Sequence, residues 1–294
     1  MSAAAGSGCS DQEHRAGGHA WAAPVAVAVD APAKLTLSLR VVGVRPDGYH
    51  LIDAEMVTLD LADALLIGDG DGLDVVDATG MPQGGSIALE ELGDDNLVRR
   101  ALVAAGRRAH VVLTKRIPAA AGLGGGSADA AAILRWAGCS DAGVALRLGA
   151  DVPFCVAGGR ARVSGIGEVV EALPYEERHF VLLSPPFPVS TAAVFAAWDE
   201  AAAGGDGSAA RGDSVNDLER AALGVEPRLG AYRDRLWALT GRRPRLAGSG
   251  GTWFVEGGIE PAALAEAGTR ARACQGLLVE AATVPATTLR PHPA

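Results

Sequence analysis

A glycine-rich segment, Pro118–Ala128, is the strongest chemical signal in the sequence. Four of its glycines fall within five residues, a serine follows them, and an alanine-rich run comes next. Glycines let backbone N–H groups approach an anion closely, and the start of a helix adds partial positive charge. We therefore predict that this glycine loop binds phosphate, with the Ser127 hydroxyl available to a phosphate oxygen or to Mg²⁺. A tight strand–helix connection without a ligand is the alternative, and the density of glycines argues against it.

The glycine loop does not match two common phosphate-binding motifs. No Lys-Ser or Lys-Thr follows the glycines, as a Walker A loop requires, and Ser127 stands where a dinucleotide fingerprint needs its last glycine. The prediction therefore rests on the local chemistry of the segment. The predicted binding residues of the loop are Pro118, Ala119, Ala120, Ala121, Gly122, Leu123, Gly124, Gly125, Gly126, Ser127 and Ala128.

Lysine is rare in this sequence, which makes the position of each lysine informative. The 26 Lys and Arg residues include only two lysines, Lys34 and Lys115. Arginine fills the other cationic positions, so a lysine is a candidate for a role that needs a compact ammonium group. Lys34 and Thr36 alternate with Leu35 and Leu37, so on a strand the two polar residues share one face. A lysine on a sheet face is usually only solvated, but its rarity here favours a functional role for Lys34.

Two other segments place polar side chains where a ligand could reach them. The run Arg45–His50 indicates a Pro-Asp-Gly turn, and the Tyr49 and His50 that end it could stack on a nucleobase and hydrogen-bond to it. In Leu148–Phe154, Asp151 is either the N-cap of a short turn or a functional carboxylate. The residues alone leave both interpretations of this aspartate open.

A second glycine segment, Ala247–Thr252, lies between two strand-like runs. Its small residues permit close packing, or a second wall beside bound phosphates. As an isolated motif it would be an ordinary hairpin, so its meaning depends on the other segments.

Composition restricts the partners of the chain. Its net charge of −9 disfavours nucleic acid, because an acidic surface repels phosphate backbones. The four cysteines are widely spaced and indicate no metal site. No apolar run approaches the ~18 residues that a membrane span needs, and none is typical of a signal peptide. We expect a cytoplasmic monomer or weak homodimer that binds a small molecule and neither nucleic acid nor membrane.

Hydrophobic periodicity predicts an α+β protein with two domains after a disordered tail at residues 1–23. For the N-terminal domain, residues 24–173, it predicts strands near 25–29, 35–39, 54–61, 64–68, 73–77 and 109–114, and helices at 94–106, 126–137 and 141–148. For the C-terminal domain, residues 174–290, it predicts strands at 179–184, 244–247, 252–256 and 276–282, helices at 191–202, 227–239 and 260–272, and a short helix from 216. Apart from an insert at 204–226, this order is β-α-β-β-α-β, the ferredoxin-like pattern.

Together these segments resemble the motifs of the GHMP kinases. The order of Pro32–Lys34, Gly122–Ser127 and Gly248–Gly250 is similar to the three motifs of that family. The resemblance runs from about residue 32 to residue 284. It implies the two-domain GHMP kinase fold, with an N-terminal mixed β/α domain and a C-terminal ferredoxin-like domain. The segments that resemble the family member acting on CDP-methylerythritol are Arg45–His50, Asp95–Leu97, Gly149–Pro153 and Asn216–Glu219.

The resemblance implies an enzyme that uses ATP to phosphorylate the 2-hydroxyl of CDP-methylerythritol in isoprenoid precursor synthesis. Asp151 would accept or orient the hydroxyl proton, and Lys34 would stabilise the charge that develops beside it. The phosphates of ATP would lie over the glycine loop, with Mg²⁺ beside Ser127. Tyr49 and Phe195 would sandwich the cytosine. The implied substrate-binding residues are Thr36, Tyr49, His50, Thr191, Phe195, Gly248, Ser249 and Gly250, of which Thr36 stands where the family usually has Asn.

Two other functions stay open on the sequence. A different GHMP kinase, of the mevalonate or homoserine type, would keep the glycine loop but need no nucleobase pocket, and Asp47–His50 argues against it. A non-catalytic nucleotide-binding paralogue should have lost Lys34 or Asp151, and this chain has both.

Overall fold

The computed structural model describes residues 26–81, 95–203, 214–259, 276–286 and 292–293. The tail expected at 1–23 and the helix expected at 260–272 lie outside these residues. Across the described residues, the chain has the α+β character that the periodicity predicted. Of the helices that the structure describes, none combines the length and the apolar character needed to cross a membrane.

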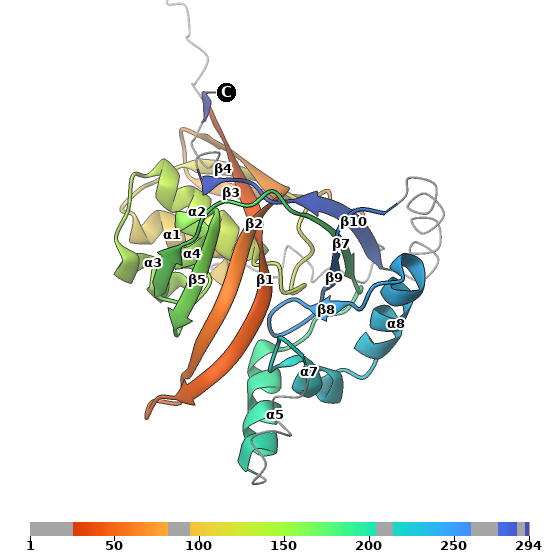
Figure 1. The fold of residues 1–294 in the computed structure, drawn as a ribbon. Coiled ribbons are helices and arrows are strands. Elements are labelled where there is room, and N and C mark those ends of the chain that lie inside the picture. Colours follow the sequence, from red (N-terminus) through yellow and green to blue (C-terminus); the bar gives the residue numbers. More distant parts are fainter. Residues whose placement is uncertain (1–25, 82–94, 204–213, 260–275, 287–291, 294) are drawn as a thin grey trace, which may run out of the picture.

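Two long antiparallel strands form the centre of the N-terminal part (Figure 1). β1 spans Val27–Val44 and β2 spans His50–Gly68. The sequence predicted two shorter strands in place of each, but β1 continues through Pro32 with a shift of register against β2. One shift falls between Pro32 and Lys34, and the next comes directly after Thr36. Such irregularities bend a strand and redirect its side chains, and here they flank both polar residues.

The other N-terminal strands extend this pair to a sheet of seven strands in the described residues. Its order is β11-β1-β2-β4-β3, and β5 pairs with both β2 and β6. β3 lies parallel to β4, and the remaining pairs are antiparallel. The sequence did not predict β5 or β6. The bounds are Gly72–Asp77 for β3, His110–Lys115 for β4, Arg160–Gly165 for β5, Val169–Ala172 for β6 and His292–Pro293 for β11.

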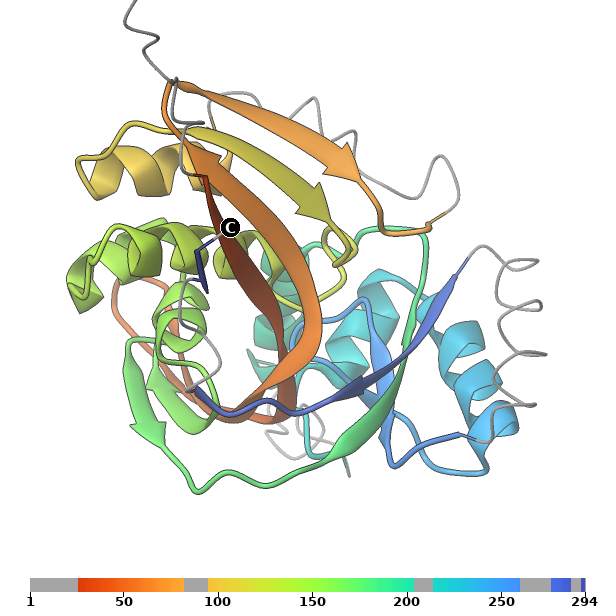
Figure 2. The same cartoon turned by 90° about the horizontal axis from the view of Figure 1, so that it is seen from above.

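Four helices lie together on one side of the β1–β2 pair (Figures 1 and 2). They are α1 (Leu97–Ala104), α2 (Gly125–Trp136), α3 (Ala142–Leu148) and α4 (Val152–Ala157). α2 is the central helix, because it contacts β1, α1 and α4. Its run of alanines lets it approach these neighbours closely, and its middle turns are buried. The helix α4 was not predicted.

In the C-terminal part, the described residues form a four-stranded antiparallel sheet in the order β10-β7-β9-β8. β7 and β10, the first and last of these strands along the chain, are neighbours in the sheet. This is consistent with the predicted β-α-β-β-α-β pattern. The helix α8 packs on β7 and β9, and α5 contacts α7. The bounds are His179–Ser184 for β7, Thr191–Ala203 for α5, Glu219–Val225 for α7, Leu229–Thr240 for α8, Arg245–Leu246 for β8, Trp253–Glu256 for β9 and Leu277–Ala282 for β10.

The two parts meet along β1 and β2. Leu35 and Leu37 of β1 belong to a buried cluster that also contains Phe180 and Phe254 of the C-terminal sheet. Lys34 and Thr36, which alternate with these leucines, line a cavity beside the helices. This is the alternation that the sequence predicted. The domain boundary near residue 173 stays a prediction.

Candidate active site

Lys34 and Asp151 lie side by side. The Nζ atom of Lys34 is 3.2 Å from Oδ2 of Asp151, and it donates a hydrogen bond to Oγ1 of Thr36 at 3.2 Å. The Lys34 side chain is 7% exposed and the Asp151 side chain is 34% exposed. The ammonium group is therefore shielded from water, while the carboxylate remains open to a ligand. Such a pair can accept a proton from a hydroxyl and stabilise the negative charge that results.

The structure separates the two interpretations of Asp151. The residue occupies the N-cap position of α4, but its side chain makes no capping hydrogen bond. By contrast, the side chain of Asp141 caps α3 by accepting hydrogen bonds from the N–H groups of Gly143 and Val144. The Asp151 carboxylate lies next to Lys34 instead, so capping does not account for an acid at this position.

The glycine loop starts helix α2 directly beside Lys34. Gly124 is the N-cap of α2 with a φ of 68°, and as a glycine it has no side chain to cap the helix. The first N–H groups of α2 are therefore available to an anion. A β-carbon at Gly124 would lie 2.7 Å from Cγ of Lys34, so only glycine permits this approach. In addition, the backbone N–H of Lys34 donates to the carbonyl of Leu123 at 3.0 Å.

The second glycine segment also lies next to Lys34. A β-carbon at Gly248 would stand 3.5 Å from Nζ of Lys34, and Gly250 lies against Gly122 of the glycine loop. Asn216 holds this segment in place, because its Nδ2 donates a hydrogen bond to the Gly248 carbonyl at 2.7 Å. The glycine loop, the second glycine segment and Asp151 are distant from one another in the sequence. In the folded chain they meet around the ammonium group of Lys34.

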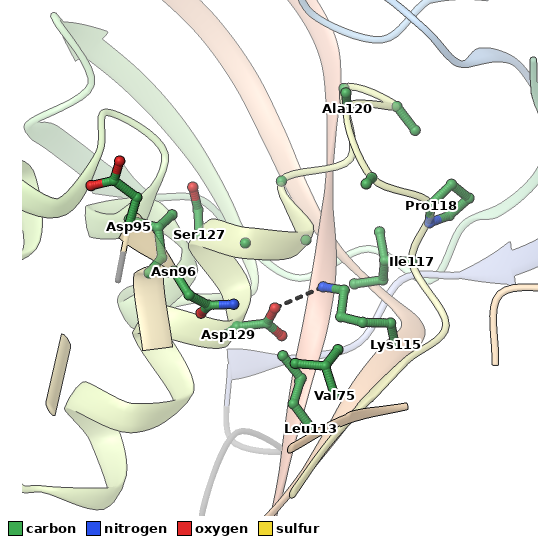
Figure 3. A pocket seen from close by; sticks show the side chains of 17 residues that line it. Val75, Asp95, Asn96, Leu113, Lys115, Ile117, Pro118, Ala120, Ser127 and Asp129 are labelled. Carbon is green, nitrogen blue, oxygen red and sulfur yellow. Dashed lines mark hydrogen bonds and ion pairs between the residues drawn. The ribbon is translucent and has the colours of Figure 1, made fainter. Parts of the chain in front are cut away.

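Two cavities meet at the glycine loop. The first has a volume of about 330 Å³ and the second about 620 Å³, and Gly122 and Ser127 line both. Groups bound in the two cavities can therefore come together at these residues. The predicted loop residues that line the first cavity are Pro118, Ala119, Ala120, Ala121, Gly122, Gly124, Gly125, Gly126 and Ser127 (Figure 3). Leu123 and Ala128 are buried and do not line it.

The second cavity brings together nearly all the other predicted site residues. They are Lys34, Thr36, Tyr49, His50, Asp151, Thr191, Phe195, Gly248 and Ser249. Gly250 does not line this cavity. Thr191 and Ser249 face each other, with their hydroxyl oxygens 2.8 Å apart, which connects the start of α5 to the second glycine segment.

His50 is fixed at one end of the second cavity. Its Nε2 lies 2.8 Å from Oδ1 of Asp199, and its ring centroid lies 4.5 Å from that of Phe195. The edge of the ring also meets Trp198 at 5.8 Å between centroids. Tyr49, next to His50, is 59% exposed. Sequence reasoning missed Asp199, because only the fold brings α5 next to the start of β2.

A buried ionic cluster forms one wall of the first cavity. The Nζ atom of Lys115 is ion-paired with Asp63 and, at 2.7 Å, with Oδ2 of Asp129. Figure 3 shows the Lys115 and Asp129 side chains pointing toward one another. Burial alone would lower the pKa of Lys115, but the charges of Asp129 and Asp63 outweigh burial and raise it. Sequence reasoning gave Lys115 no role, although its rarity was the signal that could have found it.

Asp129 is the least satisfied member of this cluster. Burial raises the pKa of Asp129 to about 7, against the opposing effect of the Lys115 charge. Its Oδ1 atom is buried and has no hydrogen-bond partner among the described residues. The charge of Asp63, which shares the Lys115 ammonium group with Asp129, adds to the effect of burial and also raises the pKa of Asp129.

The residues around the glycine loop also match a known family. The model of the GHMP kinases N terminal domain matches residues 96–159. A Paracoccus denitrificans protein named 4-diphosphocytidyl-2-C-methyl-D-erythritol kinase is 39% identical over 237 residues, which cover 76% of this chain and 84% of that protein. A Rhodopseudomonas palustris (strain BisA53) protein of the same name is 38% identical over 299 residues, which cover 88% of this chain and 98% of that protein. The chain belongs to the GHMP kinase family.

A solved structure supports the assignment of this chain to the GHMP kinase family. The crystal structure of a 4-(cytidine 5'-diphospho)-2C-methyl-D-erythritol kinase matches it with a TM-score of 0.65 and 31% sequence identity. The match covers 87% of this chain and 99% of that one. The predicted two-domain α+β fold of the family is therefore confirmed.

Both asparagines of this GHMP kinase have structural positions next to the cavities. Asn96 caps α1 by accepting a hydrogen bond from the Val98 N–H at 2.8 Å, and it lines the first cavity. Asn216 holds the second glycine segment beside Lys34, and its Oδ1 accepts a hydrogen bond from the Leu218 N–H at 3.0 Å. The two segments that resembled family motifs around these residues therefore shape the site without reaching its reacting centre.

Proposed function

We propose that this kinase transfers the γ-phosphoryl group of ATP to the 2-hydroxyl of 4-diphosphocytidyl-2-C-methyl-D-erythritol. The observation that carries the proposal is the position of the Lys34–Asp151 pair in the second cavity, close to where the first cavity joins it. A phosphate donor in the first cavity and an alcohol in the second would bring their reacting groups together there. The names of the relatives support this choice of substrate.

The first cavity has the features that a nucleotide needs. The free N–H groups at the start of α2 suit its phosphates, and the rest of the cavity is lined partly by apolar side chains such as Val75 and Leu113. In the described residues, no three His, Cys, Asp or Glu side chains form a metal site. This fits Mg²⁺, which usually takes many of its oxygen ligands from phosphates and water. Ser127 would supply a hydroxyl ligand, and the bound ion would neutralise phosphate charge.

The Lys34–Asp151 pair would carry the chemistry. The Asp151 carboxylate accepts the proton of the substrate's 2-hydroxyl while the oxygen of that hydroxyl forms a bond to the γ-phosphorus of ATP. The bond from that phosphorus to the bridging oxygen of ADP breaks at the same time. ADP leaves with the electron pair of that bond, and the proton ends on the Asp151 carboxylate. Lys34, 3.2 Å from Asp151, stabilises the negative charge that develops on the hydroxyl oxygen and the transferred group. Thr36 holds the ammonium group in position through its hydroxyl.

The polar end of the second cavity suits cytosine. When His50 is neutral and donates its Nε2–H to Asp199, its Nδ1 atom carries a lone pair and acts as an acceptor. Cytosine has an amino group that can donate to this acceptor, whereas uracil has a carbonyl oxygen at the same position. Tyr49 and Phe195 offer aromatic faces for stacking. Asp199 would therefore be a positioning residue that selects the cytosine-binding tautomer of His50.

A substrate comparison tests this function. The full chain would be assayed for ADP release with ATP and Mg²⁺, and with CDP-methylerythritol, mevalonate or homoserine as the acceptor. We expect turnover with the first acceptor alone, and ³¹P NMR should place the new phosphate on its 2-oxygen. Comparable turnover of mevalonate or homoserine would reassign the substrate. ATP binding with no turnover of any acceptor would identify a non-catalytic paralogue and contradict the proposal.

A further inference from the structure

A third cavity lies outside the candidate active site, between α1, α3 and the turn before β3. Its volume is about 750 Å³, and five arginines line it: Arg99, Arg100, Arg107, Arg108 and Arg147. We call it the arginine groove. It shares no lining residue with either of the other two cavities. The glycine loop and the Lys34–Asp151 pair therefore do not explain it.

Within the described residues, few acidic side chains neutralise the positive charge of the arginine groove. Elsewhere in the described residues many arginines are ion-paired with an acid, as in Arg162–Asp53 and Arg228–Glu226. In the groove Arg108 alone has such a pair, with Asp71 at 2.6 Å. Among the residues that the structure describes, the other four arginines have no acidic partner. The groove is thus a strongly cationic region on a chain whose net charge is −9.

The walls of the arginine groove are held together by the fold. The Nη2 atom of Arg100 in α1 donates a hydrogen bond to the carbonyl of Arg147 in α3 at 3.4 Å. Leu102 and Leu148 line the groove and are only 7% and 8% exposed. The guanidinium groups therefore surround a partly apolar surface. Like charges gathered in this way repel one another, and a bound anion would relieve that repulsion.

We propose that the arginine groove binds a free small molecule that carries a diphosphate or triphosphate group. A planar guanidinium group can donate two parallel hydrogen bonds to one phosphate, which makes arginine well suited to phosphate binding. Several arginines around one groove match a ligand with several negative charges better than a singly charged ion. The acidic surface of the rest of the chain disfavours a nucleic acid as the occupant.

The groove site is separate from the nucleotide site, although both use α1. Asn96 and Leu97, at the start of α1, line the first cavity, whereas Arg99 and Arg100 line the arginine groove. Phosphate bound at the glycine loop should therefore be insensitive to substitutions in the groove. This difference allows the two sites to be distinguished in one titration.

Isothermal titration calorimetry with inorganic diphosphate tests the proposal. The parent chain would be compared with Arg107→Gln/Arg147→Gln, which removes two exposed groove arginines whose side chains donate no hydrogen bond within the described residues. The control for net charge is Arg233→Gln/Arg243→Gln, which likewise removes two positive charges, from α8 and the turn that follows it. We expect the groove variant to lose about tenfold or more in affinity, as two charge-assisted contacts disappear. The control variant should stay within about twofold of the parent.

Several outcomes would overturn the proposal. Diphosphate binding that is unchanged in the groove variant would assign the anion to the glycine loop. An equal loss in the control variant would indicate an effect of net charge alone. Orthophosphate binding as tightly as diphosphate would contradict recognition of a multiply charged group. Thermal melting of all three proteins, expected to coincide, excludes misfolding as the cause of a loss.

Discussion

The first and second cavities each contain one of the two lysines of the chain, and the surroundings of these lysines differ. Within the described part of the chain, Lys34 has a single acidic partner, Asp151, whose side chain is 34% exposed. Lys115 lies between two acids, Asp63 and Asp129, whose side chains are 0% and 4% exposed. Both ammonium groups are buried, so the exposure of the partner is what separates them.

This difference indicates a structural role for Lys115 and a ligand-directed role for Lys34. A lysine enclosed by buried carboxylates is committed to the fold, because removing it leaves charge without compensation inside the protein. A lysine whose acid remains open to a cavity can instead act on a bound ligand. The rarity of lysine marked both positions, but only the structure shows which of them faces the reacting groups.

The same substitution at the two lysines should affect the stability of the protein very differently. We expect Lys115→Met to lower the free energy of unfolding by about 3–5 kcal/mol, the usual effect of removing one member of a buried ion pair. Lys34→Met should change it by less than about 1 kcal/mol, because water can reach Asp151. Urea unfolding of both variants is the measurement. Equal losses would mean that the two lysines do the same structural work.

Tyr49→Ala probes the open character of the second cavity. Because Tyr49 is 59% exposed, we expect little change in stability. Stacking on a base contributes roughly 1–3 kcal/mol, so KM for the cytidine-containing substrate should rise accordingly while KM for ATP stays constant. Steady-state kinetics with each substrate varied in turn checks this. A rise in KM for ATP, with no rise in KM for the cytidine-containing substrate, would show that Tyr49 does not belong to the cytosine pocket.

The buried cluster of the first cavity should show itself in the pH dependence of stability. The pKa of Asp129 is raised from 3.8 to about 7 in the folded protein, so the folded chain keeps a proton that the unfolded chain has released. This contribution to stability is complete below about pH 4 and is lost as the pH rises through 7. We expect the parent to lose more than about 1 kcal/mol relative to Asp129→Asn over that range.

The measurement is urea unfolding of the parent and of Asp129→Asn at several pH values between 4 and 8. Acid effects common to both proteins cancel in the difference. A difference that is flat, or that favours the parent increasingly as pH rises, would show that Asp129 is an ordinary ionised partner of Lys115.

Asp199→Ala should have the smallest effect. It removes one hydrogen bond to His50 at a partly exposed site, which is worth about 1 kcal/mol. KM for the cytidine-containing substrate should therefore rise several-fold, with discrimination against the uridine analogue reduced. Kinetics with the cytidine and uridine compounds in parallel provide the check. Unchanged discrimination would remove Asp199 from the account of base selection.

The sequence predicted most of the fold and the local part of the site. Period-two alternation placed Lys34 and Leu35 on opposite faces of β1, and the density of glycines marked the start of α2. Local patterns carry such information because side-chain direction repeats along a strand. The division of β1 and β2 into shorter strands was wrong, since a proline and a change of polarity do not end a strand that a register shift can carry onward.

The rest of the site depends on contacts between distant segments. Asp199 is far from His50 in the sequence, and nothing in either segment indicates the hydrogen bond between them. The same holds for Asp63, whose pairing with Lys115 requires β2 and β4 to be neighbours. The two interpretations of Asp151 were equally open in the sequence, because an N-cap and a functional acid look alike until the partner of the carboxylate is known.

The kinetics of Asp151→Asn test whether Lys34 and Asp151 form the reacting centre. Asn is nearly the same size and the Asp151 side chain makes no capping bond, so the unfolding free energy should stay within about 0.5 kcal/mol of the parent. If Asp151 accepts the hydroxyl proton beside Lys34, kcat should fall by about 10²–10⁴ while ATP still binds. Lys34→Ala should show the same loss, and the double variant should lose less than the sum of the two. Full activity in Asp151→Asn would contradict the assignment of this pair as the reacting centre.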